Sequence, residues 1–91
     1  LKIYGNRVNL DEIDRLIKER FDFIDCASAG IDDNMYIFVT DNSVVEDVRH
    51  FIAEKTKLNA AAFNVIKIDE IPKNDSGKTL YKELAKYYEN A

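Results

Sequence analysis

Tryptophan is absent from this 91-residue sequence, and cysteine and histidine occur once each, as Cys26 and His50. A single cysteine excludes a disulfide framework and a cysteine metal cluster. We expect Cys26 to be a small, half-buried side chain in a strand. A lone histidine without a second ligand nearby is a poor zinc candidate, so His50 is expected at the surface. No apolar run approaches the ~20 residues of a membrane helix, and no signal or transit peptide is visible.

A basic excess is also missing, since 17 acidic residues against 13 basic ones give a formal net charge of −4. A nucleic-acid-binding protein needs a basic stripe that displaces counterions from phosphates, so that class is not expected. Positive charge does gather locally, at Lys67, Lys73, Lys78, Lys82 and Lys86. This local excess favours one small anionic ligand over a polyanion.

The length and the pattern of apolar residues predict one α+β domain. Ninety-one residues are enough for one modest core, and a strand-like run already under way at Leu1 suggests a piece of a longer chain. The predicted order is β-β-α-β-β-α-β-α, with three helices packed on a small mixed or antiparallel sheet of about three main strands, plus a short two-stranded N-terminal ribbon. The predicted strands are 1–5 with 7–8, 21–30, 35–41 and 64–71, and the predicted helices are 9–20, 43–56 and 79–91.

Local signals set the predicted boundaries. Asn9 with Glu12, and Ser43 with Glu46, have the three-residue spacing of a capping box at a helix start. The turn-rich residues 31–34 predict a hairpin between the second and third long runs. Pro72 is expected to end the last strand, because proline lacks a backbone donor and restricts the residue before it.

The stretch "IPKNDSGKTLYKEL", residues 71–84, contains Gly77-Lys78-Thr79, which resembles the end of a phosphate-binding loop. A P-loop needs a glycine five positions before Gly77, where this chain has Pro72, so we reject that function. Two readings of Lys78 remain. It is either a solvated lysine in a polar turn, or a charge at the root of the last helix, whose N-terminus favours anions.

Two stretches together resemble the C-terminal domain of the adenylate-forming (AMP-binding) superfamily, which includes acyl- and aryl-CoA synthetases, peptide-synthetase adenylation domains and luciferases. The first family motif reads roughly Lys-x-x-Gly-x-Arg-hydrophobic-x-x-x-Glu-Ile-Glu, and the last reads Pro-x-x-x-x-Gly-Lys. The matching residues are Lys2, Gly5, Arg7, Val8, Glu12, Ile13 and Asp14 in "KIYGNRVNLDEID", and Pro72, Gly77 and Lys78 near the end. The resemblance spans essentially the whole chain.

The resemblance implies that residues 1–91 are the mobile C-terminal domain of an ATP-dependent acid–thiol ligase, expected in the cytoplasm. Lys78, beside Gly77, would stabilise the reaction of a carboxylic acid with ATP. The Gly5-Asn6-Arg7 loop would serve transfer of the acyl group to coenzyme A or to the pantetheine arm of an acyl carrier protein. ATP and Mg²⁺ would be held mainly by the N-terminal domain, so this chain supplies no metal site and is expected to catalyse nothing alone.

The chain departs from the family pattern in three places. Tyr81 stands where a basic residue is usual, with Lys82 next to it, so a contact made by that basic group is lost or shifted by one. Asp14 replaces the second glutamate of the first motif. The family's hinge residue would precede Leu1.

Other interpretations stay open at this point. Arg7 is either a phosphate contact or a surface arginine paired with Glu12 or Asp11, and Glu12 itself is better explained by helix capping. For the whole chain, the alternative is a small non-catalytic binding module that docks an acidic partner through its lysine-rich edge.

Overall fold

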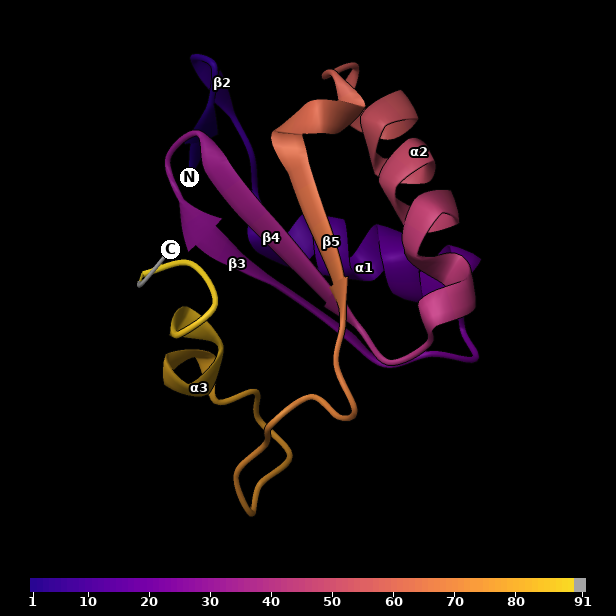
Figure 1. The fold of residues 1–91 in the computed structure, drawn as a ribbon, viewed down its shortest axis with the longest axis vertical. Helices are drawn as coiled ribbons and strands as arrows, with labels where there is room; N and C mark the ends of the chain where they lie inside the picture. Colours follow the sequence, from indigo (N-terminus) through magenta and orange to yellow (C-terminus); the bar gives the residue numbers. More distant parts are fainter. Residues whose placement is uncertain (90–91) are drawn as a thin grey trace.

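The computed structural model describes residues 1–89 and has the predicted α+β class and element order (Figure 1). A two-stranded ribbon precedes a three-stranded sheet, and three α-helices pack around it. The elements are β1 (Lys2–Ile3), β2 (Asn6–Arg7), α1 (Leu10–Arg20), β3 (Cys26–Ile31), β4 (Asn34–Val39), α2 (Val45–Thr56), β5 (Phe63–Lys67) and α3 (Tyr81–Ala85), with single 3₁₀ turns at Asn42–Val44 and Ala60–Ala62. No helix in residues 1–89 has the length and apolar character needed to cross a membrane.

The main sheet is mixed, with β4 in the middle. β3 and β4 form the predicted hairpin, with Cys26 opposite Val39 at one end and Ile31 opposite Asn34 at the other. β5 runs parallel to β4. Parallel neighbours need a crossover connection, which α2 provides.

Each face of the sheet buries its own apolar cluster, because successive side chains of a strand point to opposite faces. Met35, Ile37 and Val39 of β4 belong to the larger cluster with α1 and α2. Phe38 belongs to the smaller cluster, with Ile71 and with Leu84 of α3. The short α3 and the segment leading into it therefore close the second face of the sheet.

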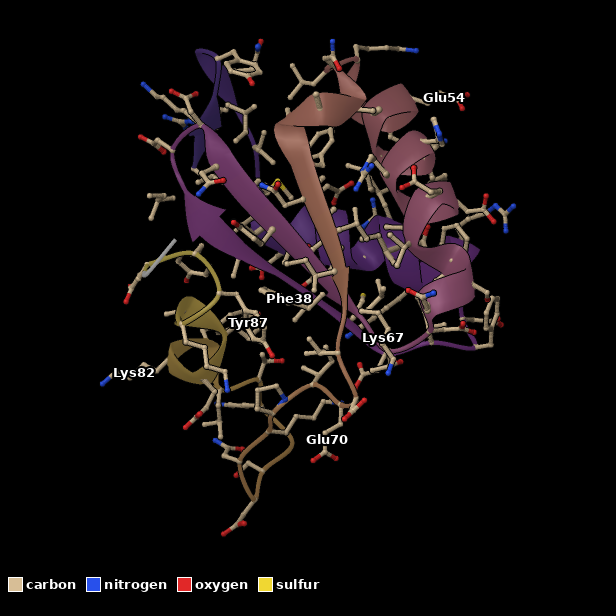
Figure 2. All side chains as sticks on the ribbon, viewed as in Figure 1. Phe38, Glu54, Lys67, Glu70, Lys82 and Tyr87 are labelled. Carbon is tan, nitrogen blue, oxygen red and sulfur yellow. The ribbon has the colours of Figure 1, made fainter. Side chains whose placement is uncertain are left out.

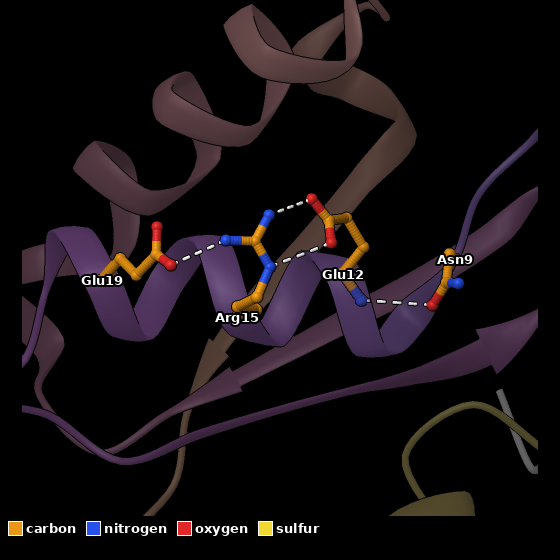
Figure 3. A network of polar contacts seen from close by, with 4 residues as sticks. All are labelled: Asn9, Glu12, Arg15 and Glu19. Atoms are coloured by element: carbon orange, nitrogen blue, oxygen red, sulfur yellow. Dashed lines mark hydrogen bonds and ion pairs between the residues drawn. The ribbon is translucent and has the colours of Figure 1, made fainter.

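Asn9 begins α1, but only half of the predicted capping box forms. The Asn9 Oδ1 accepts a hydrogen bond from the Glu12 N–H at 3.2 Å, as predicted. The Glu12 carboxylate does not reach back to the cap, since it pairs with Arg15, which also holds Glu19 at 2.7 Å (Figure 3). Arginine one turn further on offers a charged partner that competes with the neutral cap amide.

The second predicted capping box, Ser43 with Glu46, is wrong. The Asp41 carboxylate accepts hydrogen bonds from the Ser43 N–H at 2.9 Å and the Ser43 hydroxyl at 2.7 Å. It caps a 3₁₀ turn, and α2 begins after that turn at Val45. A carboxylate two residues before Ser43 is the stronger acceptor and takes the capping role.

Most predicted bounds differ from the observed ones, among them the predicted strand 35–41, which ends at Val39, and three elements are at least four residues too long at one end. Residues 21–25 do not join β3, and β5 ends at Lys67, before Pro72, because β4 has no residue beyond Val39 to pair with it. The last helix covers Tyr81–Ala85 instead of 79–91. Thr79 is held in a β-bridge to Lys73, so the helix cannot begin there. The end of that prediction, residues 90–91, lies outside the described residues.

Candidate functional site

Residues 72–80, which carry Lys78, form a small hairpin (the Lys78 hairpin) that projects from the body of the domain between β5 and α3 (Figure 1). The Leu80 N–H donates to the Pro72 carbonyl at 2.8 Å, and the Asn74 N–H donates to the Lys78 carbonyl at 2.9 Å. The Gly77 N–H closes the tip by donating to the Asn74 carbonyl at 2.9 Å. The predicted loop is therefore an ordered turn with its own ladder.

The side chain of Asn74 fixes the tip of this hairpin. Its Oδ1 accepts from the Ser76 N–H at 2.9 Å and from the Lys78 N–H at 3.0 Å. Gly77 has φ +81°, and a Cβ there would meet nothing within 4 Å. Glycine is therefore favoured here by the left-handed backbone of the turn and not by crowding. Sequence reasoning missed Asn74, although Asn before Asp-Ser-Gly is a turn signal.

Lys78 presents an unpaired ammonium group. Its side chain is exposed and makes no hydrogen bond or ion pair with any residue of 1–89. The predicted position at a helix root is wrong, since α3 begins three residues later, at Tyr81, and spans only five residues. The charge available to an anion here is that of the lysine itself, carried on a hydrogen-bonded hairpin.

The lysine-rich edge is less positive than the sequence suggests. Lys67 pairs with Asp69 at 2.9 Å, and Lys73 pairs with Asp25. Lys82 and Lys86 have no acidic partner within the described residues, and Lys82 points away from the body of the domain (Figure 2). Three of the five lysines thus keep an uncompensated charge, among them Lys78.

Tyr81, which replaces the family's basic residue, faces α1. Burial raises the pKa of its hydroxyl, and the nearby carboxylates of Asp14 and Asp11 raise that pKa further. A basic side chain at this position would meet the same two carboxylates. The neighbouring Lys82 does not take over such a contact, because it makes no ion pair within residues 1–89.

The second predicted motif lies on the N-terminal ribbon. Tyr4 and Gly5 form its two-residue turn with φ 51° and 82°, the conformation that matches the twist of a hairpin. The Asn6 side chain donates to the carbonyls of Ile3 and Tyr4, both at 3.3 Å. A Cβ at Gly5 would meet nothing within 4 Å of this chain, so only the backbone conformation explains this glycine within the domain.

Arg7 and Lys2 are directly opposite each other on the ribbon, as the register pairs their Cα atoms. The predicted alternative, a pairing of Arg7 with Glu12 or Asp11, does not occur, since Glu12 is bound to Arg15. Both cations border a surface cavity of about 460 Å³, together with Asn9 and Asp32. Like charges placed directly opposite one another are unfavourable, and the Asp32 carboxylate at this cavity accepts a hydrogen bond from the Lys2 backbone N–H at 2.8 Å but pairs with neither side chain. This ribbon is therefore a second place where the chain could bind a phosphate.

The structure does not bring the two motifs together. The Gly5 turn and the Lys78 hairpin lie at opposite ends of the longest axis (Figure 1), in a domain that measures 35 × 28 × 21 Å. One small ligand cannot touch both. Among residues 1–89 there is also no group of three or more His, Cys, Asp or Glu side chains arranged to hold a metal ion.

Two polar contacts of the body were not predicted. The buried Ser28 hydroxyl donates to the Asp14 carboxylate at 2.6 Å, and Asp25 at the start of β3 holds Lys73 of the hairpin. Cys26, beside Asp25, is fully buried and not half-buried. Burial raises the pKa of its thiol to about 12, so Cys26 is a core side chain and no nucleophile.

No protein-family model matches this chain, and the search of curated proteins finds no match.

Proposed function

We propose that this chain is the C-terminal lid domain of an ATP-dependent carboxylic acid–thiol ligase of the adenylate-forming type. The observation that carries the proposal is Lys78, an exposed and unpaired ammonium group on a hydrogen-bonded hairpin, in the position of the family's final motif. The order of the two motifs in the sequence supports it, as does the free pair of cations at the first motif.

In the first step, a carboxylate attacks the α-phosphate of ATP, forming an acyl-adenylate and releasing pyrophosphate. Both reacting groups are anions, so negative charge accumulates where they meet. The Lys78 ammonium, projected into a neighbouring active site, offsets that charge in the transition state. Lysine suits this task because a compact ammonium on a flexible stem enters a crowded site more readily than a guanidinium.

In the second step, the thiol of coenzyme A or of a carrier-protein pantetheine arm takes the acyl group, and AMP leaves. The Gly5 turn carries no side chain, and its surroundings within this domain are open, so a narrow arm could pass along it. Arg7 and Lys2 would then meet the phosphate of the acceptor, which relieves their mutual repulsion.

The separation of the two motifs gives this proposal a geometric requirement. Because they lie at opposite ends of the domain, one pose cannot serve both steps, and the domain has to turn between them. The N-terminal domain of the ligase is the partner that such a movement needs. It would hold ATP, Mg²⁺ and the acid, and the ligase would act in the cytoplasm.

The test uses the intact ligase and follows carboxylate-dependent exchange of pyrophosphate with ATP over a panel of acids. We expect Lys78→Ala to lower the exchange rate by about 10²–10³, the usual loss for one charge-stabilising group. Thioester formation from supplied acyl-adenylate should stay largely intact. Lys82→Ala is the matched control, because it removes another exposed, unpaired lysine.

Two outcomes would contradict the proposal. Acyl-adenylate formation by the 91-residue chain alone would show that no second domain is needed. Exchange unaffected by Lys78→Ala would leave Lys78 as a turn residue. The alternative is docking of an acidic partner through Lys78, Lys82 and Lys86, in which each of the three substitutions has a small effect on binding of that partner and none on exchange.

A further inference from the structure

The Lys78 hairpin is held to the body of the domain at few points. Its residues 73–78 are exposed, and a cleft of about 650 Å³ lies at its root, between Asp25 and Thr40 on the body and Pro72, Lys73 and Leu80 on the hairpin. The apolar anchors, Ile71 and Leu84, are buried just before and well after the hairpin. The position of the hairpin above the cleft thus depends on contacts that bridge the cleft.

One ion pair makes such a bridge. The Lys73 ammonium binds Oδ2 of Asp25, a residue 48 positions earlier in the sequence. The two side chains are 40% and 33% exposed, so the pair is partly shielded from water. A partly shielded pair is screened less than a surface pair. No other side-chain hydrogen bond or ion pair within residues 1–89 joins the hairpin to the sheet.

Asp25 takes part in further hydrogen bonds. Its Oδ1 accepts from the Cys26 N–H at 3.0 Å, and its backbone N–H donates to the Thr40 hydroxyl at 3.2 Å. Cys26 is the first residue of β3, and Thr40 directly follows β4. The two carboxylate oxygens therefore have separate tasks: Oδ1 fixes Asp25 to the sheet, and Oδ2 holds the hairpin.

The hairpin couples the position of Lys73 to that of Lys78. Lys73 forms a β-bridge with Thr79, the residue after Lys78, and the next pair of the ladder joins Asn74 to Lys78 at 2.9 Å. A displacement of Lys73 consequently moves Lys78 with it. A misplacement of about 1 Å in an active site can cost on the order of 10² in rate.

We propose that Lys73 and Asp25 are positioning residues for adenylation: their ion pair sets the place from which Lys78 reaches the reacting phosphate. This inference rests on the proposed function and adds two residues that do not touch the substrates. The pair acts only on the step that uses Lys78, because the Gly5 turn at the other end of the domain does not contact the hairpin.

The first test measures pyrophosphate exchange in the intact ligase. Lys73→Met and Asp25→Asn should each lower the exchange rate about tenfold or more, whereas Lys73→Arg, which keeps the charge, should retain most of it. Asn at position 25 keeps the Oδ1 acceptor for the Cys26 N–H. Lys67→Met is the matched control, because it breaks the Lys67–Asp69 pair outside the hairpin, and it should leave the rate unchanged.

The second test needs no activity. In the 91-residue chain, hydrogen exchange of the Lys78 amide, which is bonded to Asn74 Oδ1, should become about tenfold faster in Lys73→Met and Asp25→Asn. Lys73→Arg and Lys67→Met should leave it unchanged. Far-ultraviolet circular dichroism establishes that each variant is folded.

The outcomes separate this inference from the proposed function. If Lys78→Ala abolishes exchange of pyrophosphate while Lys73→Met and Asp25→Asn do not lower it, the function stands and the positioning role is wrong. If Lys78→Ala has no effect, the proposed function is wrong. Unchanged amide exchange at Lys78 in both charge-removing variants overturns the positioning role in either case.

Discussion

At the scale of single residues, Asp14 is the acid whose environment is least favourable to its charge. It is a half-buried residue of α1 that faces β3. Burial raises its pKa to about 6 despite the hydrogen bond from the Ser28 hydroxyl. Asp11 adds to the increase, and Lys18 opposes it. The folded state therefore binds a proton at Asp14 at a pH where the unfolded chain, with its ordinary pKa near 3.8, has already lost it.

Because of this shift, the charged form of Asp14 lowers the free energy of unfolding at neutral pH. Protonation of Asp14 stabilises the folded state. This contribution is fully present below about pH 4 and is lost as the pH rises through about 6. Asp14→Asn, which can still accept from Ser28, should therefore raise the free energy of unfolding at pH 7.5 by about 1–2 kcal/mol. That is less than the full 1.36 kcal/mol per pKa unit, because water partly solvates this side chain. Urea unfolding from pH 4 to 7.5 measures the difference between variant and wild type.

The difference itself should grow with pH and vanish near pH 4. Asp22→Asn, at an exposed acid without a hydrogen-bond partner within residues 1–89, is the control and should show no such trend. A difference between Asp14→Asn and wild type that is independent of pH would contradict the assignment of the shift to Asp14.

At this scale, contacts between near residues were predicted in part, and contacts between distant residues were not predicted. The Asn9 cap was predictable because its donor is three residues away. The bonds from Ser28 to Asp14 and from Lys73 to Asp25 were not, because they span 14 and 48 residues and depend on how α1 and the hairpin dock on β3. For the same reason the sequence could not show that the charge of Lys73, on the same hairpin as Lys78, is compensated.

At the scale of elements, Gly77 and Asn74 determine the turn of the Lys78 hairpin. Gly77→Ala should lower the free energy of unfolding by about 1–2 kcal/mol, because an L-residue with a Cβ is strained at φ +81°. Gly77→Asn should cost less, since asparagine tolerates the left-handed conformation. Urea unfolding compares the variants, with Ser76→Ala in the same turn as the control.

Comparing Gly77→Ala with Gly77→Asn distinguishes backbone conformation from steric crowding as the reason for glycine at this position. The position is open to 4 Å around a Cβ, so the larger asparagine should still be the milder change. Equal losses for alanine and asparagine, or a greater loss for asparagine, would contradict the conformational explanation.

The same hairpin explains why the last helix is shorter than its apolar spacing predicts. Leu80, Leu84, Tyr87 and Tyr88 do recur at helical intervals, but the Leu80 N–H is bonded to the Pro72 carbonyl. Beyond Ala85, the N–H groups of Tyr87 and Tyr88 bond three residues back, to Leu84 and Ala85, which is the tighter pattern of a helix end. Periodicity predicts which residues face the core, and the tertiary bonds decide where the helix begins and ends.

At the scale of the whole molecule, two candidate sites that share no residue occupy opposite ends of one small domain (Figure 1). The class, the order of elements and the mixed or antiparallel sheet followed from periodicity and turn residues. The distance between the two motifs could not be predicted, because it depends on the sheet that separates them. If the chain acts as the proposed ligase domain, this distance requires the domain to move between the two half-reactions.

A change at one end should therefore affect one half-reaction and spare the other. Arg7→Ala should lower the rate of thioester formation in the intact ligase about tenfold, the effect of losing one hydrogen bond to a charged group. Pyrophosphate exchange should stay within about twofold of wild type, because Lys78 and its hairpin are untouched. Single-turnover assays of each step, started from ATP and acid or from supplied acyl-adenylate, separate the two rates.

Arg20→Ala is the control for Arg7, since it removes an exposed arginine at the far end of α1 that stacks on Phe21 without binding an acid in residues 1–89. Lys78→Ala should give the opposite pattern to Arg7→Ala, with exchange lost and transfer retained. If Arg7→Ala lowers both half-reactions equally, Arg7 does not act on the transfer step in particular. The cation pair on the ribbon would then be a structural feature of the N-terminal turn, and only the Lys78 hairpin would belong to the active site.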